Sequence, residues 1–379
     1  MQGRGVVKPP TGIVFDTDFG NNIDSVLTLG FLRSVAGKGE ARLIAVSISK
    51  ANLKAAQAED AITKFYEGPP PPGRGGAFGG GVGGNPDMVG LADNGKMAGD
   101  TPILNLLVGK KGPDGKPAYP GTIANLLDTA EPGLTMRNIL LAQNDLNAVV
   151  VLDGPATGVV QLMDLYGARP QITAKVKYLV AVMGAYPSGA ADANVRNDVA
   201  AARKMFAEWP TPIIAVGSEV GESLPYPATS IEKDFTWAVP SHPVVDAYKA
   251  FKPMPYDAPV AGMAAALYAA HPDDGYFKLS EPGTITVLDD GRTKFTPGAG
   301  GKHRYLIADP AQKDKVIALY TELVSAKPVP RAAFGRGRGG RGASGAGGRG
   351  ASGGRGVLPP AAIAPASPAP VANIPPPQE

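Results

Sequence analysis

Short apolar runs alternate with amphipathic stretches at the start of the chain. Residues 12–15 form an apolar run that ends at the polar segment 16–22, and apolar residues then recur at helical spacing from Ile23 to Phe31. A second apolar run, at residues 43–48, precedes an amphipathic stretch from Leu53 to Tyr66. We therefore predict strand, helix, strand and helix in succession, which is the pattern of a parallel sheet.

The same alternation returns in the second half of the chain. We predict further strands and helices in this order: strand 148–152, a helix from residue 159, strand 176–183, helix 199–208, strand 213–216, helix 261–270, a hairpin at 283–295 around Asp290-Gly291, and helix 314–326. The predicted fold class is α/β, an open and mostly parallel sheet flanked by helices. The loops of such repeats gather at the carboxyl ends of the strands, where open α/β sheets bind ligands.

Composition divides the chain into three parts. Residues 1–11 are a short N-terminal extension, residues 12–327 form one α/β domain, and residues 328–379 are a tail of Gly-Arg and then Ala-Pro repeats, which predicts disorder. Within the domain, residues 68–86 contain four successive prolines followed by a glycine-rich stretch. This composition predicts a mobile surface insertion that interrupts the domain without ending it.

The formal charge of +3 is unevenly distributed. Residues 331–379 carry six arginines and one acid, a net +5, so subtracting +5 from +3 leaves −2 for the remainder. The domain therefore offers no basic face for nucleic acid, and any attraction to a polyanion resides in the Arg-Gly tail. Because the tail has almost no aromatic residues to stack on bases, a solvated tail or linker is the favoured interpretation.

Cysteine is absent, which excludes disulfides, thiolate metal sites and cysteine nucleophiles but leaves the compartment open. No apolar run approaches the ~20 residues of a membrane span, and residues 1–10 lack the apolar stretch of a signal peptide. We expect a protein that is soluble as written, either cytoplasmic or exported after removal of a signal.

The most informative segment is 16–25, which reads Asp-Thr-Asp-Phe-Gly-Asn-Asn-Ile-Asp-Ser. Three carboxylates, Asp16, Asp18 and Asp24, lie within nine residues at the corner between the first strand and the first helix. They repel one another unless a cation or a polar ligand is shared among them. The alternative is a helix capped by Asn22 or Asp24, with solvated acids.

This segment resembles the signature of the inosine/uridine-preferring nucleoside hydrolase family, in its long form D-T-D-x-G-N-D-x-D-D. Four further segments resemble family motifs in the same order: Gly154-Pro155-Ala156-Thr157, Val182-Met183-Gly184, Asp192-Ala193-Asn194 with Asp198, and residues 256–268 with the turn at 271–277. The resemblance runs from about residue 13 to residue 323. It implies a nucleoside-hydrolase-like, Rossmann-like fold and hydrolysis of the N-glycosidic bond of ribonucleosides to base and ribose.

The resemblance also implies roles for individual residues. Members of the family hold Ca²⁺, which activates a water for attack on the anomeric carbon. By this likeness Asp18 is the catalytic base and a metal ligand, and Asp24 grips the ribose hydroxyls. Asp24 also belongs to the implied metal set, with the backbone carbonyl of Thr157 or Ala156. The other implied substrate-binding residues are Asp16, Asp192, Asn194 and Met183.

The chain departs from the family pattern at the metal site. Asn22 and Ser25 stand where the signature has aspartates, and Gly262 stands in place of a late calcium-binding carboxylate. Calcium prefers six to eight oxygens, several of them charged, so these replacements weaken the Ca²⁺ site that the resemblance implies. Asp153 or Asp257 would have to supply the missing oxygen.

Two functions remain open on these residues. One is a nucleoside hydrolase with weakened or lost activity, and the other is a non-catalytic relative that binds a nucleoside or a sugar. A scaffold with a functional tail is a third, less supported reading. We expect a small-molecule nucleoside as partner and, from the family's habit, a dimer or tetramer. The three histidines match no catalytic histidine of the family and are expected to be structural: His242, His271 and His303.

Overall fold

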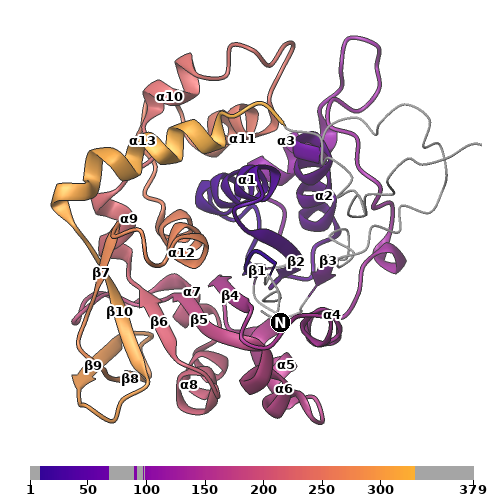
Figure 1. Ribbon diagram of the computed structural model, residues 1–379. Coiled ribbons are helices and arrows are strands. Elements are labelled where there is room, and N and C mark those ends of the chain that lie inside the picture. Colours follow the sequence, from indigo (N-terminus) through magenta and orange to yellow (C-terminus); the bar gives the residue numbers. More distant parts are fainter. Residues whose placement is uncertain (1–8, 68–88, 92–96, 98, 329–379) are drawn as a thin grey trace, which may run out of the picture. The chain divides into compact units, whose positions relative to one another are not determined.

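The computed structural model describes residues 9–67, 89–91, 97 and 99–328 (Figure 1). Its strands are β1 (Gly12–Thr17), β2 (Arg42–Ile48), β3 (Val89–Leu91), β4 (Ala148–Asp153), β5 (Val176–Val182), β6 (Ile213–Val216), β7 (Phe277–Leu279), β8 (Gly283–Val287), β9 (Thr293–Pro297) and β10 (His303–Ala308). They form one ten-stranded sheet in the order β3-β2-β1-β4-β5-β6-β10-β8-β9, with β7 paired to β10 outside this path. Pairing is parallel from β3 to β10 along this order, whereas β7 and β8 run antiparallel to β10, and β9 runs antiparallel to β8.

Helices cover both faces of this sheet (Figure 1). One side carries α1 (Ile23–Lys38), α2 (Leu53–Glu67), α3 (Pro102–Gly109), α11 (Pro243–Phe251), α12 (Ala261–Ala270) and α13 (Lys313–Val324). The other carries α4 (Pro132–Leu141), α5 (Thr157–Asp164), α6 (Ala168–Lys175) and α8 (Val199–Glu208). The remaining short elements are η1 (Leu126–Asp128), α7 (Ala193–Asn197), α9 (Ser218–Ser223), α10 (Ala228–Lys233) and η2 (Pro310–Gln312).

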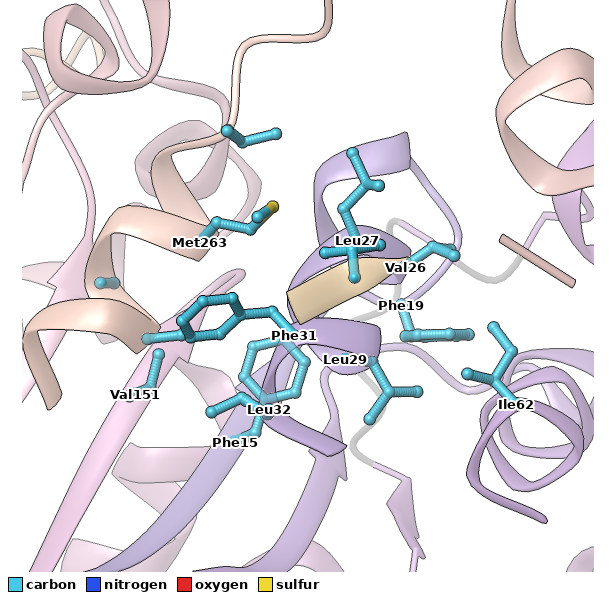
Figure 2. Packing of buried hydrophobic residues seen from close by; sticks show 14 of the residues in the cluster. Phe15, Phe19, Val26, Leu27, Leu29, Phe31, Leu32, Ile62, Val151 and Met263 are labelled. Carbon is cyan, nitrogen blue, oxygen red and sulfur yellow. The ribbon is translucent and has the colours of Figure 1, made fainter. Parts of the chain in front are cut away.

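The central strands are apolar on both sides because each side faces a helical layer. Along β1, Ile13 and Phe15 point into the core beneath α1 and α12, and Val14 points into the core beneath α4 and α5. Figure 2 shows the first of these cores, where side chains of β1, β4, α1, α2 and α12 meet. Burial on both faces explains why the strand sequences are continuous apolar runs rather than alternating ones.

Helix α1 begins at Ile23, after the turn at residues 18–22 that follows β1, and Asn22 is its N-cap. The Asn22 side chain accepts a hydrogen bond from the Ser25 amide at 3.1 Å, which is the N-cap geometry. Of the two predicted caps, Asn22 is therefore the one used at this helix. Every residue of α1 from Ile23 to Val35 is buried, because the helix lies between the sheet, α2, α12 and α13.

The predicted fold class is confirmed. The predicted strands correspond to β1, β2, β4, β5 and β6 with ends displaced by at most two residues, and the predicted hairpin is β8 and β9. Residues 87–147 received no predicted element, yet they contain β3, η1, α3 and α4. A strand of three residues and helices of eight and ten residues are too short to show a clear period.

The predicted insertion at 68–86 lies outside the described residues, as do residues 1–8 of the predicted extension and residues 329–379 of the predicted tail. Within the described residues, no helix combines the length and the apolar character needed to cross a membrane.

The strand order reverses direction at β1. The chain moves from β1 outward through β2 to β3 and then returns to place β4 on the opposite side of β1. The loops after β1, β2 and β4 therefore leave the sheet at one edge, at a topological switch point of the kind where open α/β sheets bind ligands. We therefore expect a ligand-binding site at this edge of the sheet.

A close backbone approach holds the β1 and β4 loops together at this edge. A Cβ on Gly154 would lie 2.7 Å from the Asp18 nitrogen and 3.0 Å from the Thr17 carbonyl carbon, so only glycine fits. We expect Gly154→Ala to lower the free energy of unfolding by about 1–3 kcal/mol in urea denaturation. The control is Gly109→Ala, whose Cβ meets no atom within 4 Å and which should be neutral or slightly stabilising. Equal stability of both variants would contradict the close approach.

Candidate functional site

Four aspartates meet at the switch point, and all are nearly inaccessible to solvent. Asp16 and Asp18 come from the end of β1, Asp153 from the end of β4 and Asp24 from the first turn of α1. Their exposed fractions are 0%, 4%, 3% and 8%, respectively. The fold therefore concentrates four acidic side chains in a buried place, and each needs compensation for lost solvation.

Asp16 is held between the loop after β2 and helix α5. Its Oδ1 accepts a hydrogen bond from the Ser49 hydroxyl at 2.7 Å, and its Oδ2 is buried without a hydrogen-bond partner among the described residues. A Cβ on Gly158 would overlap the Asp16 carboxylate, so the glycine in the first turn of α5 leaves room for it.

Two successive hydrogen bonds, through Asn21, connect Asp18 to Lys50. Its Oδ2 accepts a hydrogen bond from the Asn21 amide at 3.0 Å, and Asn21 Oδ1 accepts one from Lys50 Nζ at 2.7 Å. Lys50 is completely buried and also donates to the Gly99 carbonyl at 3.2 Å. Asp18 Oδ1 is buried and unpartnered within the described part of the chain.

Asp24 is bound by the start of helix α12. Its Oδ2 accepts the Gly262 amide at 2.7 Å, and its Oδ1 accepts the Thr28 hydroxyl at 3.1 Å. A carboxylate in this position is stabilised by the first amides of the helix, which have no partner within the helix, and by the helix dipole. Both oxygens of the proposed ribose-gripping carboxylate are therefore engaged by the protein itself.

Asp153 occupies the space that a side chain at residue 262 would need. A Cβ on Gly262 would overlap Asp153 Oδ2, an oxygen that is buried and has no hydrogen-bond partner in the described ranges. The backbone carbonyl of Asp153 accepts the Asp18 amide at 3.2 Å, which fixes the two acidic loops against each other. Of the two carboxylates considered as replacements, Asp153 lies in the cluster, whereas Asp257 accepts the Ala228 amide at the start of α10.

Burial raises the pKa values of all four carboxyl groups in the cluster. It raises the pKa of Asp16 and of Asp18 to about 7; hydrogen bonds from Ser49 and Asn21, respectively, oppose the rise. It raises the pKa of Asp24 to about 6, with the Gly262 amide opposing. The pKa of Asp153 is raised well above its usual range by burial and by the charges of Asp24 and Asp18. Near neutral pH the cluster therefore holds protons that separate carboxylates would have released.

The residues present do not fit a calcium site. Ser25 directs its hydroxyl into its own loop, where Oγ accepts the Gly20 amide at 3.0 Å and donates to the Asn22 carbonyl at 3.1 Å. Both oxygens of Asp24 already accept hydrogen bonds from the protein, and residue 262 brings no side chain. Across the described residues, no group of three or more His, Cys, Asp or Glu side chains is arranged to hold a metal ion.

The other predicted site residues lie on neighbouring strand ends. The Thr157 hydroxyl donates to Asp198 at 2.8 Å, and the Asn194 amide donates to the Val182 carbonyl at 2.9 Å. Asp192 caps α7 by accepting the Val195 amide at 3.1 Å, and its charge raises the pKa of Asp153. Met183 is fully buried in the core beneath α8. The structure thus places Asp192 within electrostatic range of Asp153, and gives Thr157, Asn194 and Met183 contacts of their own.

The histidines lie in structural contacts apart from these carboxylates. His242 caps α11 and is surrounded by Phe65, Phe235 and Trp237, and burial lowers the pKa of its imidazole to about 3. His303 accepts the Ile285 amide at 2.9 Å, and His271 lies between Glu40 and Asp274. These contacts agree with the structural role expected for all three.

Sequence reasoning missed Lys50, Ser49 and Asn21. The signal for the first two was available, because they directly follow β2 and the ends of adjacent parallel strands meet at one edge. Asn21 lies inside the acidic segment, but the resemblance assigned roles only to the acids of that segment. The polar residues that follow β2 therefore indicate the site as well as those that follow β1 do.

A separate groove of about 400 Å³ lies between α10 and α13. It is lined by residues of these two helices and their flanks, including Thr229, Lys233 and Asp314, and by none of the four aspartates. It is open and of mixed polarity, so it is a different feature from the carboxylate cluster.

Comparison with known proteins relates the backbone to one group of enzymes. No family model matches the chain, and no curated protein matches its sequence. Among solved structures, the purine-preferring ribonucleoside hydrolase from Gardnerella vaginalis is 14% identical with a TM-score of 0.59, covering 84% of this chain and 99% of that chain. The inosine-uridine preferring nucleoside hydrolase from Bacillus anthracis is 16% identical with a TM-score of 0.56, covering 83% and 99%. The chain has the nucleoside hydrolase fold.

Another solved structure with this fold is the type III effector protein XopQ complexed with adenosine diphosphate ribose. It is 14% identical with a TM-score of 0.55, covering 85% of this chain and 95% of that chain. The resemblance found in the sequence is therefore confirmed at the level of the fold. Near-complete coverage at such low identity means that the backbone of the nucleoside hydrolase fold is kept while most side chains differ.

The raised pKa values give a stability test. Asp18 has a folded-state pKa of about 7, above the ordinary 3.8, so the folded state keeps a proton that the unfolded state loses as the pH rises. This contribution to stability is present below pH 3.8 and is lost as the pH rises through 7. We expect Asp18→Asn to raise the free energy of unfolding by on the order of 2–4 kcal/mol at about pH 8, in urea denaturation, with a gain that shrinks toward about pH 4.

Asp290→Asn is the matched control. The Asp290 carboxylate is exposed, and hydrogen bonds from Arg292 lower its pKa, so this change should not stabilise the protein at about pH 8. A loss of stability in Asp18→Asn at that pH would show that the Asp18 charge is fully compensated.

Proposed function

We propose that the carboxylate cluster binds the ribosyl part of a nucleoside and hydrolyses its N-glycosidic bond. The observation that carries this proposal is the Asp18 carboxyl, whose Oδ1 is buried and without a hydrogen-bond partner in the described residues, at the switch point of the sheet. Its pKa of about 7 is the value at which a general base works best near neutral pH. The nucleoside hydrolase fold supports the choice of substrate class.

The chemistry requires no group beyond those present at this edge. Asp18 accepts a proton from a water molecule, the water oxygen bonds to the anomeric carbon, and the carbon–nitrogen bond breaks. The bonding electrons leave with the base, which takes up a proton from solvent because none of the three histidines lies in the cluster. The sugar becomes cationic in the transition state, and the nearby carboxylate of Asp16, in its ionised form, stabilises that charge.

A second function is binding without hydrolysis, and one observation favours it. Asp24, the acid that the family likeness assigns to the ribose hydroxyls, gives both oxygens to Thr28 and Gly262. A ribose ligand would have to compete with the start of α12 for this carboxylate. The structure of XopQ with adenosine diphosphate ribose suggests that compound, beside inosine and uridine, as a ligand to test.

Base release from inosine and uridine, followed by chromatography, tests the first function. We expect free base from the wild-type protein and at least a hundredfold slower release, order of magnitude, from Asp18→Asn, because the general base is lost. Asp290→Asn, an exposed surface change, should keep the wild-type rate. A rate that Asp18→Asn leaves unchanged would rule out Asp18 as the base.

No release by the wild-type protein would contradict hydrolysis of these substrates. Titration calorimetry with inosine, ribose and adenosine diphosphate ribose then tests the binding function. Saturable binding that Asp18→Asn or Asp16→Asn weakens supports it, and the absence of heat with all three ligands contradicts it.

A further inference from the structure

Lys50 is a fully buried lysine next to the carboxylate cluster. Its Nζ donates to Asn21 Oδ1 at 2.7 Å and to the Gly99 carbonyl at 3.2 Å. A buried ammonium group is costly unless a negative charge or several acceptors compensate for it. Burial lowers the pKa of Lys50, and the charges of Asp18 and Asp100 oppose this shift by favouring the charged lysine.

The contact with Lys50 fixes the orientation of the Asn21 side-chain amide. An amide side chain has one acceptor and two donor hydrogens, and its ends are interchangeable unless the surroundings fix them. Because Lys50 can only donate, it holds Asn21 Oδ1 on its own side and turns the Asn21 amide group toward Asp18 Oδ2, 3.0 Å away. One oxygen of Asp18 therefore faces a hydrogen-bond donor, and the other, Oδ1, is left unpartnered among the described residues.

We propose that Lys50 is the resident cation of this site, positioning Asn21 and through it Asp18, and that the protein operates here without a divalent metal ion. Lys50 is a positioning residue, because it acts on Asp18 through Asn21. The proposal goes beyond the assignment of a substrate, since it concerns how the acidic cluster is neutralised.

The surrounding contacts disfavour a divalent metal ion. Asp18 Oδ2 accepts a hydrogen bond from Asn21, and both oxygens of Asp24 accept hydrogen bonds, which leaves these oxygens fewer lone pairs for an ion. The unpartnered oxygens of the cluster among the described residues, one each on Asp16, Asp18 and Asp153, fall short of the about six to eight oxygens that calcium takes. Asp153 fills the space above Gly262, where a further ligand would enter. Within the described residues, the Lys50 ammonium and the partial positive charge at the start of α12 both lie next to the cluster.

Calcium binding tests the proposal directly. The wild-type protein and the variants Lys50→Met and Lys50→Arg would be titrated with CaCl₂ by calorimetry, and their melting temperatures compared in CaCl₂ and in EDTA. Lys54→Met is the matched control, because Lys54 lies on the same segment but is partly exposed and paired with Asp100.

We expect millimolar calcium and EDTA to leave the wild-type melting temperature unchanged. Lys50→Met removes the fixed charge and frees Asn21 to turn, so its affinity for calcium should exceed that of the wild type by about tenfold or more. Lys50→Arg retains the charge and should resemble the wild type, as should Lys54→Met. A lysine that only fills space would leave calcium affinity the same in Lys50→Met and Lys50→Arg.

Two results overturn the proposal. One is a wild-type melting temperature that micromolar calcium raises and EDTA lowers, and this measurement decides even if Lys50→Met does not fold. The other is a folded Lys50→Met whose calcium affinity equals that of Lys54→Met. No nucleoside enters these experiments, so absence of hydrolysis leaves their outcome untouched, and calcium binding by the wild type leaves the hydrolysis assay untouched.

Discussion

Burying four carboxyl groups at one end of a parallel sheet is the constraint on which this structure depends. Asp16, Asp18, Asp24 and Asp153 are each at most 8% exposed, so none can rely on water to stabilise its charge. Hydroxyl and amide donors, the start of α12 and Lys50 partly compensate for the lost solvation. What these groups leave uncompensated appears as raised pKa values. Chemistry at this edge is therefore set by how much negative charge the protein can hold there.

The nucleoside hydrolase fold explains why the acids meet at all. A strand order that reverses at β1 brings the loops of β1, β2 and β4 together, whatever their side chains are. This is why the backbone matches solved nucleoside hydrolases at 14% and 16% identity. The side chains at the edge are free to change provided that charge and space remain balanced, and Lys50 and Asp153 show how that balance is reached in this chain.

The fold could be predicted from sequence because the central strands are apolar on both faces, and their runs at residues 12–15, 148–152 and 213–216 have no competing interpretation. The site could be predicted only in part. The acidic segment identified Asp16, Asp18 and Asp24 as neighbours, because they are close in the chain. The engagement of Asp24 by Gly262 could not be predicted, since those residues are 238 positions apart and a backbone amide leaves no mark in the sequence. The position of Lys50 directly after β2 marked it as a residue at this edge of the sheet, but its burial was not predictable, because a lysine after a strand is ordinarily a solvated one.

The overlap between Asp153 and the space above Gly262 restricts how this protein can change over evolutionary time. A mutation that introduced an acid at residue 262 would meet the Asp153 carboxylate in a core with no room for both, and is expected to destabilise the protein. Loss of Asp153 would have to come first. The effects of substitutions at residues 153 and 262 on stability are therefore expected to be non-additive, since each side chain needs the space that the other would fill.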